Sequence, residues 1–366
     1  MSGDAPDGER RNLLGLPLPG LAEALGDLAD RPYRVRQIFA AIHRRGAADF
    51  EAMTDLPAAL RRELARRFSL ALPALTERRD SDDGTTKFLL ELADGASIEA
   101  VDIPDGERRT LCLSSQAGCA LACTFCVTGH WGAGRDLTAA EIVGQVRLVR
   151  ALASLPDHFN LVFMGMGEPL LNLAAVGDAI ALLGESLALR RITVSTAGVV
   201  PGIDDLARWP ERPNLAVSLH APDDERRTRI MPINRSWPIA ELVGALRRFP
   251  LEPRRRITIE YLMLEGFNDA PRDADALVRL LAGVDVKFNL IPFNPDPVLP
   301  DWMTRPEPAR VEAFRARLES RGATVTVRRQ RGHDVAAACG QLRAFARPPR
   351  GPRARRPASG GHGDAV

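Results

Sequence analysis

The feature that most limits the fold of this 366-residue chain is a regular alternation of β-rich and helical segments from Thr110 onward. The β-rich runs are TLCLSS, NLVFMG, ITVST, NLAVSLH, RITIEYLML, KFNLIPF and TVTVRR. Amphipathic stretches such as TAAEIVGQVRLVRALA separate them. Parallel strands joined by crossover helices produce this pattern. The sequence therefore predicts an α/β fold, with a full or partial (β/α) barrel over 110–346.

Two smaller units are expected before the barrel. Residues 1–75 are predicted to form a helical domain, because LAEALGDL, YRVRQIFAAIHRRG and TDLPAALRRELARRF have apolar residues at helical spacing. Thr54 or Asp55 is the expected N-cap of the last of these helices. The segments KFLLEL and SIEAVDIP, separated by a turn-forming Asp-Gly pair, predict a β-hairpin in a short extension over 76–109.

The end of the chain differs in composition from the rest. Residues 347–366 carry five Arg and one Asp, or +4, whereas the whole chain carries +2. The other residues therefore sum to about −2, and net charge does not indicate a nucleic-acid-binding protein. A segment of Pro, Gly and Arg cannot bury enough apolar surface to order by itself. A disordered, solvated tail is predicted, with a contribution to RNA binding as the alternative.

The amino-terminal sequence and the cysteine count indicate a cytoplasmic protein. MSGDAPDGER has acids where a signal peptide needs basic residues, and no stretch approaches the ~18 uninterrupted apolar residues of a membrane span. The cysteine count is five, an odd number, and cytosolic thiols stay reduced. Metal binding or catalysis is therefore expected of the cysteines, rather than a framework of structural disulfides.

The spacing Cys119-x3-Cys123-x2-Cys126 is the strongest chemical signal. Three thiolates in a short loop after the strand TLCLSS can ligate three irons of a 4Fe-4S cluster and leave the fourth iron open. S-adenosylmethionine (SAM) can chelate that iron through its amino and carboxylate groups. Structural zinc is the alternative, but it normally needs four ligands, and the neighbourhood offers only His130 as a fourth.

Polar residues at the ends of the following strands predict a SAM pocket. Parallel strands bring their carboxyl ends to one edge of the sheet, where cofactors bind. Each residue taken alone is explained equally well as a turn, cap or structural residue, whereas together they favour a binding site. The candidates are Gly167, Glu168, Ser195, Ser218, Leu219, His220 and Asn294.

The sequence resembles the RlmN/Cfr group of rRNA methyltransferases, and is nearer to RlmN. The resemblance runs from about residue 12 to about 346 and is carried by YRVRQIF, MTDLP, CLSSQAGCALACTFC, FMGMGEPLLN, ITVSTAG, AVSLHAP and AAACGQL. It implies a partial radical SAM barrel with one 4Fe-4S cluster, and two SAM molecules used per turnover. It also implies methylation of adenine carbon 2 in the peptidyl-transferase region of 23S rRNA and 3′ to the anticodon of some tRNAs.

The same resemblance implies roles for individual residues. Cys119, Cys123 and Cys126 match the cluster ligands, and the strand-end residues named above match SAM contacts. Cys339 matches the cysteine that carries the methyl group, Cys112 its partner thiol and Glu99 the proton acceptor. Without the resemblance, Glu99 is expected to be an exposed strand residue, and both distal cysteines are expected to be small buried apolar residues.

Other functions remain open at this point. They are methylation of adenine carbon 8, a radical SAM reaction on another substrate, and a non-catalytic iron-sulfur or zinc module that binds RNA. The favoured assignment requires RNA and an external electron donor as partners. It involves no membrane and implies a monomeric protein.

Overall fold

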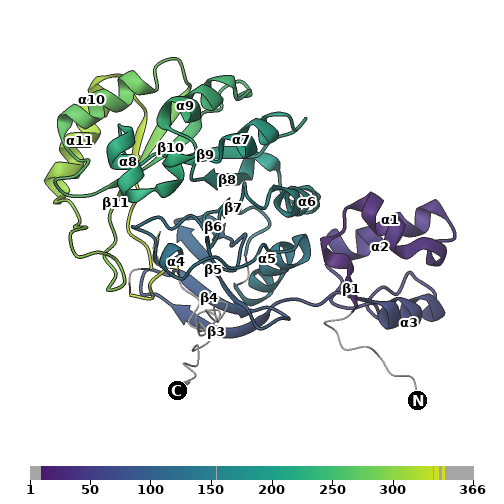
Figure 1. Cartoon of the computed structure of the whole chain (residues 1–366). Coiled ribbons are helices and arrows are strands. Elements are labelled where there is room, and N and C mark those ends of the chain that lie inside the picture. Colours follow the sequence, from purple (N-terminus) through teal and green to yellow (C-terminus); the bar gives the residue numbers. More distant parts are fainter. Residues whose placement is uncertain (1–9, 154, 333, 338–339, 343–366) are drawn as a thin grey trace, which may run out of the picture.

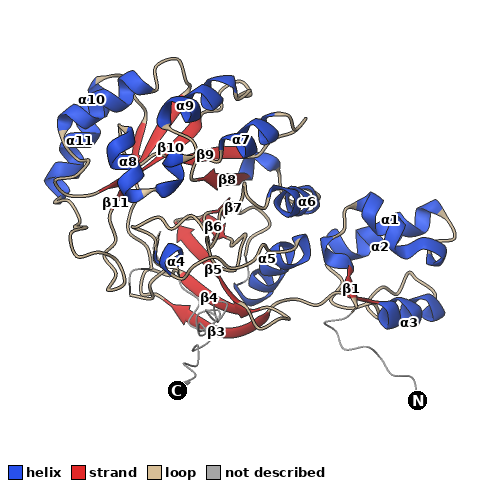
Figure 2. Cartoon of the chain, in the orientation of Figure 1, coloured by secondary structure: helices blue, strands red, loops and turns tan. Residues whose placement is uncertain are grey.

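The computed structural model describes residues 10–153, 155–332, 334–337 and 340–342. Its centre is a ten-stranded sheet in the order β12-β11-β10-β9-β8-β7-β6-β5-β4-β3 (Figures 1 and 2). All neighbours from β6 to β12 pair parallel, as the alternating sequence predicted. The order is linear, so the sheet is a partial barrel with two edges. These strands are β6 (Arg108–Cys112), β7 (Asn160–Phe163), β8 (Ile192–Thr196), β9 (Asn214–Ser218), β10 (Ile257–Met263), β11 (Val286–Pro292) and β12 (Val325–Val327).

Helices connect the parallel strands and cover one face of the sheet (Figure 2). Their apolar sides face buried strand residues such as Leu161, Val194 and Leu215. The helices are α4 (Val127–His130), α5 (Ala139–Ala153), α6 (Leu173–Leu183), α7 (Val200–Ala207), α8 (Asp224–Ile230), α9 (Ile239–Arg248), α10 (Pro271–Leu280) and α11 (Pro308–Ser320). Short 3-10 helices are η3 (Leu189–Arg191) and η4 (Pro232–Arg235).

The amino-terminal helices stand at one side of the sheet and pack through η1 against α5 and α6 (Figure 1). Three helices form where the sequence predicted them, but Thr54 and Asp55 do not cap the third. A proline disfavours the helical backbone conformation in the residue that precedes it. The helix therefore starts only after Pro57. The elements are β1 (Arg11–Asn12), η1 (Leu13–Gly15), α1 (Leu18–Leu25), η2 (Gly26–Leu28), α2 (Pro32–His43), α3 (Ala58–Arg67) and β2 (Phe68–Ser69).

An antiparallel extension lengthens the sheet at the β6 edge. The expected hairpin is β4 (Thr86–Glu91) and β5 (Ser97–Asp105), and a further strand, β3 (Ala74–Asp80), pairs with β4. The sequence did not signal β3, because ALTERRD is mostly charged and mostly exposed. β5 pairs antiparallel with β6, so the extension and the barrel share one sheet. Among the described residues, none of the helices combines the length and the hydrophobicity that a membrane span needs.

Candidate active site at the carboxyl ends of the parallel strands

A cavity of about 160 Å³ opens at the carboxyl ends of the parallel strands. Parallel strands end at the same edge of a sheet, so residues far apart in the chain meet there. The walls of the cavity include the apolar side chains of Leu121, Phe125 and Met231. Most of the predicted site residues line it, namely Cys119, Cys123, Cys126, Gly167, Glu168, Ser195, Ser218 and His220.

The three clustered cysteines lie on the loop between β6 and α4. The backbone N–H of Cys126 donates to the carbonyl of Cys123 at 3.1 Å, which turns the chain tightly between two of the thiols. Gly118 has φ +124°, and a Cβ there would lie 2.7 Å from the backbone nitrogen of Gly134. Only glycine fits where these two arms of the loop cross. The loop therefore holds three thiols at one wall of the cavity.

Burial keeps the three thiols protonated while no metal is bound. Burial raises the pKa of Cys119 to about 11 and raises the pKa values of Cys123 and Cys126. Metal binding requires thiolates, so loading is expected to release protons. Within the described ranges, no three His, Cys, Asp or Glu side chains converge on a single ion position. Three thiols beside an open cavity fit a 4Fe-4S cluster, in which each thiolate binds a different iron.

Glu168 follows β7 and joins the ends of two strands. Its Oε1 accepts from the backbone N–H of Leu170 at 3.0 Å, and its Oε2 accepts from that of Ala197 at 2.7 Å. Burial raises the pKa of Glu168 to about 7. Gly167 before it has φ +95°, and a Cβ there would lie 2.4 Å from the Cβ of Gln116. A cationic ligand in the cavity would meet this carboxylate, and its contact with SAM stays a prediction.

The Ser218-Leu219-His220 run at the end of β9 divides between the cavity and the core. Ser218 and His220 line the cavity, whereas the Leu219 side chain is packed in the hydrophobic core. Buried Arg227 ties this region together by donating to the carbonyls of Leu219 at 3.2 Å, Ser218 at 3.2 Å and Ala197 at 2.6 Å. Sequence reasoning missed Arg227, because an arginine in the helical run DERRTRI gives no sign of burial.

His220 is held as a neutral imidazole. Its φ is +59°, its Nδ1 accepts from the backbone N–H of Leu262 at 3.0 Å, and its ring meets Phe125 edge to face. Burial and, secondarily, the charge of Arg227 lower its pKa to about 3. Since Nδ1 accepts, the ring proton sits on Nε2.

Ser195 and Asn294 lie in two different, adjacent spaces. Ser195 on β8 lines the cavity, whereas Asn294, after β11, lines a smaller neighbouring hollow. Oδ1 of Asn294 accepts from Arg305 at 3.2 Å. Ile291 and Arg328 border both spaces, so the two are adjacent. The predicted SAM contact of Asn294 would therefore be made at the edge of the site.

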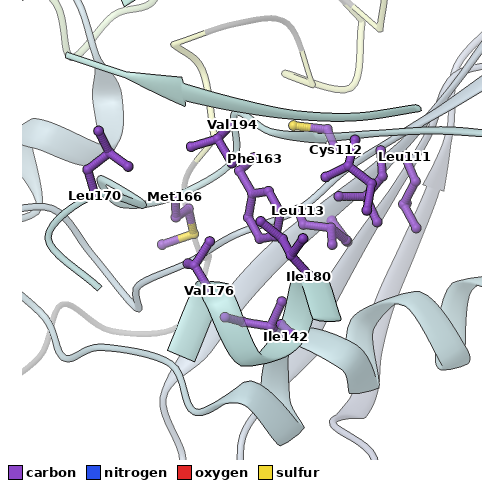
Figure 3. Close-up of a cluster of buried hydrophobic side chains, with 14 of the residues drawn as sticks. Leu111, Cys112, Leu113, Ile142, Phe163, Met166, Leu170, Val176, Ile180 and Val194 are labelled. Atoms are coloured by element: carbon purple, nitrogen blue, oxygen red, sulfur yellow. The ribbon is translucent and has the colours of Figure 1, made fainter. Parts of the chain in front are cut away.

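Cys112 is the last residue of β6, beside the antiparallel extension, and does not line the cavity. Strand register places Lys87, Val101 and Cys112 in one row across β4, β5 and β6, so their side chains share a face of the sheet. Figure 3 shows the Cys112 sulfur on the opposite side of its strand from Ile142 and Ile180, which lie on the helices behind the sheet. Cys112 therefore faces away from the helical layer.

Glu99 shares that face, because it lies two residues before Val101 on β5. It is fully buried and forms an ion pair with Lys87, with 3.2 Å between Nζ and Oε1. The expectation of an exposed strand glutamate is therefore wrong. The role of Glu99 as proton acceptor stays a prediction.

Cys339 lies outside the described residues, but residues on both sides of it are described. The carbonyl of Ala336 accepts from Lys87 Nζ at 3.1 Å. Gly340 lines the cavity, and its carbonyl accepts from the backbone N–H of Val127 at 2.7 Å. The neighbours of Cys339 thus contact both the extension and the end of the cysteine loop.

A polar row inside the barrel was not predicted. Ser218, Glu260, Asn289 and Thr326 are register partners across β9 to β12. Asn289 donates to Glu260 at 2.7 Å, and Thr326 donates to Asn289 at 3.1 Å. Burial raises the pKa of Glu260, which lines the cavity together with Arg328. The available signal was a charged residue inside the apolar run RITIEYLML.

The parallel sheet, the three-cysteine loop after its first parallel strand and the cavity at the strand ends define a radical SAM fold. Residues 113–278 match the Radical SAM superfamily. Residues 11–70 match the Ribosomal RNA large subunit methyltransferase N-terminal domain. A crystal structure of a radical SAM methyltransferase from Sphaerobacter thermophilus is similar with a TM-score of 0.85 and 44% identity, covering 91% of this chain and 99% of that one.

Curated relatives narrow the class to a family. The dual-specificity RNA methyltransferase RlmN of Anaeromyxobacter dehalogenans is 47% identical over 93% of this chain and 92% of its own length. The protein of the same name from Syntrophobacter fumaroxidans is 47% identical over 89% of this chain and 96% of its own length. This chain belongs to the RlmN family of radical SAM methyltransferases.

Proposed function

We propose that this protein methylates carbon 2 of an adenine in 23S rRNA and of the adenine 3′ to the anticodon in some tRNAs. The observation that carries the proposal is the convergence of the three clustered cysteines, Glu168 and the strand-end serines on one cavity, which Gly340, next to Cys339, also lines. The relatives that share this architecture are named dual-specificity RNA methyltransferases. Methylation of carbon 8 is the nearest alternative.

The substrate explains why such a site is needed. Carbon 2 of adenine lies between two ring nitrogens, so it is too electron-poor to attack a methyl cation donor. When bound, a 4Fe-4S cluster held by Cys119, Cys123 and Cys126 would supply one-electron cleavage of SAM and hence radical chemistry. Glu168, Ser195, Ser218 and His220 would orient SAM, and the apolar walls would keep water from reactive species.

The chain's own side chains would handle the methyl group. In this proposal the Cys339 thiolate first accepts a methyl group from one SAM molecule. That methyl group then loses one hydrogen atom to the radical produced by cleavage of a second SAM molecule, and the methylene bonds to carbon 2. After the base has lost one electron and Glu99 has taken the proton from carbon 2, Cys112 attacks the sulfur of Cys339. The bond between that sulfur and the methylene breaks with its electron pair left on carbon, and a Cys112–Cys339 disulfide forms. The methylene takes a proton from solvent, so the base leaves methylated, and an external thiol or other two-electron reductant restores the two thiols.

Arginines beside the cavity support RNA as the substrate. Arg305, Arg328, Arg329 and Arg331 border the hollow that adjoins the cavity. Guanidinium groups bind phosphate well, and their position would place an RNA backbone at the entrance. The target base must leave its stack to enter, which is least costly in RNA loops. The proposal includes a cytoplasmic, monomeric enzyme that receives electrons from an external donor.

The test is a reaction with reconstituted protein, SAM, a one-electron reductant and either a 23S rRNA fragment or a tRNA transcript. Mass spectrometry of the digested RNA should show 2-methyladenosine, with two SAM molecules consumed per methyl group. Formation of 8-methyladenosine would establish the alternative regiochemistry. One zinc per chain and no SAM cleavage would refute the enzyme and support a binding module.

A further inference from the structure

The segment at 331–337, just before Cys339, is held by the turn that joins β3 to β4. The backbone N–H of Gly332 donates to the Asp83 carboxylate at 2.9 Å. Asp334 accepts from the hydroxyl of Ser81 and, at 3.2 Å, from the backbone N–H of Asp82. These contacts join residues about 250 positions apart in sequence. The turn therefore acts as a dock for this segment.

Lys87 adds a cationic contact next to this turn. It lies on β4 and is buried, with 2% of its side chain exposed. Its ammonium contacts the carboxylate of Glu99 at 3.2 Å and donates to the carbonyl of Ala336 at 3.1 Å. Ala336 has φ +49°, a backbone conformation that non-glycine residues keep only where their surroundings impose it. One side chain thus joins Glu99 to the backbone three residues before Cys339.

The chain after Cys339 is fixed independently of Lys87. The carbonyl of Gly340 accepts from Val127, and that of Leu342 accepts from the hydroxyl of Thr128 at 2.7 Å. Both donors lie on α4, immediately after the cysteine loop. Gln341 donates to the carbonyl of Pro295 at 2.9 Å. The segment is therefore anchored to the cysteine loop on one side of Cys339 and to the extension on the other.

We propose that Lys87 is a positioning residue for methyl transfer, which holds the Glu99 carboxylate and the segment leading to Cys339 in fixed relation. This inference rests on the proposed function of Cys339. It assigns the antiparallel extension a part in the reaction, since β4 supplies Lys87, β5 supplies Glu99, and the row through Val101 continues to Cys112. Lys87 touches neither the cavity nor the RNA in this assignment.

The test substitutes Lys87→Met in the full-length reconstituted enzyme, with Lys287→Met as the control. Lys287 is the only other lysine of the chain and is exposed on β11. In Lys87→Met, SAM cleavage should stay within about twofold of wild type, while RNA methylation falls at least tenfold and amide exchange in 331–337 speeds up by about tenfold. The control should match wild type in SAM cleavage, RNA methylation and amide exchange. Unchanged exchange and methylation in Lys87→Met would overturn the proposal, as would equal losses of SAM cleavage and methylation.

A second pair of variants covers failure of Lys87→Met to fold, since that change leaves Glu99 buried without its cation. Glu99→Gln and the double variant Lys87→Met/Glu99→Gln both lack the buried carboxylate, and differ in the ammonium of Lys87 together with its contact to Ala336. Faster exchange in 331–337 for the double variant alone supports the proposal, and equal exchange in both refutes it. Exchange needs no RNA, so this result is distinct from failure of the wild-type protein to methylate RNA.

Discussion

The two halves of the ten-stranded sheet place functional groups in different ways. The parallel half, β6 to β12, offers residues from loops at its strand ends, such as Glu168 and His220. The antiparallel half, β3 to β5, offers Lys87 and Glu99 from within its strands, where both are buried. The difference suggests that the two halves have different tasks. Loops at strand ends can surround a cofactor, whereas side chains within strands are held in fixed positions relative to one another.

Each half therefore predicts a different type of failure when it is altered. Changes in the cysteine loop, which follows the first parallel strand, should remove cofactor-dependent steps altogether. Changes in the extension should leave SAM cleavage and impair the later transfer to RNA. The following predictions test that division.

The largest effect is expected for the cysteine loop. Replacing any one of Cys119, Cys123 or Cys126 with Ala should reduce reductive SAM cleavage below detection, because each thiolate supplies one iron ligand and no other cysteine lies within the loop. The measurement is 5′-deoxyadenosine production, together with iron and sulfide content. Wild-type SAM cleavage by all three variants would contradict the cluster assignment and leave the two halves undistinguished.

The next prediction contrasts the two distal cysteines. Cys339→Ala should never acquire a methyl group, whereas Cys112→Ala should methylate Cys339 and accumulate a covalent protein–RNA adduct, because no thiol remains to break the thioether. Denaturing gels with labelled RNA detect the adduct. The double variant Cys112→Ala/Cys339→Ala is the control and should form none. An adduct-free Cys112→Ala protein combined with an active Cys339→Ala protein would remove the methyl-carrier mechanism.

An intermediate effect is expected for Glu99. Glu99→Gln should retain SAM cleavage but slow RNA methylation by about 100-fold, the usual scale for loss of a general base. Asp102→Asn is a matched control on the same strand, since Asp102 is equally buried but faces the opposite side and pairs with Arg109. The control should affect stability without a selective loss of methylation. Equal methylation by the two variants, per folded protein, would argue against Glu99 as the base.

Much of the parallel half could be predicted from the sequence, and little of the extension could. Apolar strands followed by polar or glycine residues mark strand ends, so Glu168, Ser195 and Ser218 were placed correctly at one edge. Leu219 has its side chain in the core and its carbonyl bound by Arg227, and its contact with SAM stays a prediction. Position in the chain does not reveal burial of a charge. Lys87 and Glu99 resemble the exposed residues of an ordinary hairpin, and the partners of Lys87 lie on another strand and at the distant carbonyl of Ala336.

Arg227 and Glu260 illustrate the same limit within the parallel half. Both are charged residues whose burial depends on partners that are distant in sequence or on another strand, the carbonyl of Ala197 for Arg227 and Asn289 for Glu260. Helical and strand periodicity predict which face a residue occupies, but not which polar atoms lie close enough to bond with it. Such networks follow from the assembled sheet.

The smallest expected effect concerns His220 at the end of β9. It is a change in stability with pH, and it tests the burial of this residue without measuring catalysis. His220 is neutral in the fold, with a pKa of about 3 against 6.5 when unperturbed. Below pH 6.5 the unfolded chain binds a proton that the folded chain does not, so the free energy of unfolding falls as pH decreases from about 6.5 towards 3. By pH 5 the contribution of His220 to this loss should be about 2 kcal/mol.

His220→Asn should therefore lose less stability than wild type between pH 7 and pH 5. Asparagine tolerates the positive φ at this position better than other non-glycine residues, so the backbone should be preserved. Calorimetric Tm values of the apo protein at the two pH values provide the measurement, and His158→Asn, at an exposed site, is the control expected to follow wild type. Half-buried His43, whose pKa is lowered to about 4, contributes the same dependence of stability on pH in all three proteins. A wild-type slope in His220→Asn would show that His220 is not held neutral by burial, and would weaken the picture of strand ends as a dry binding surface.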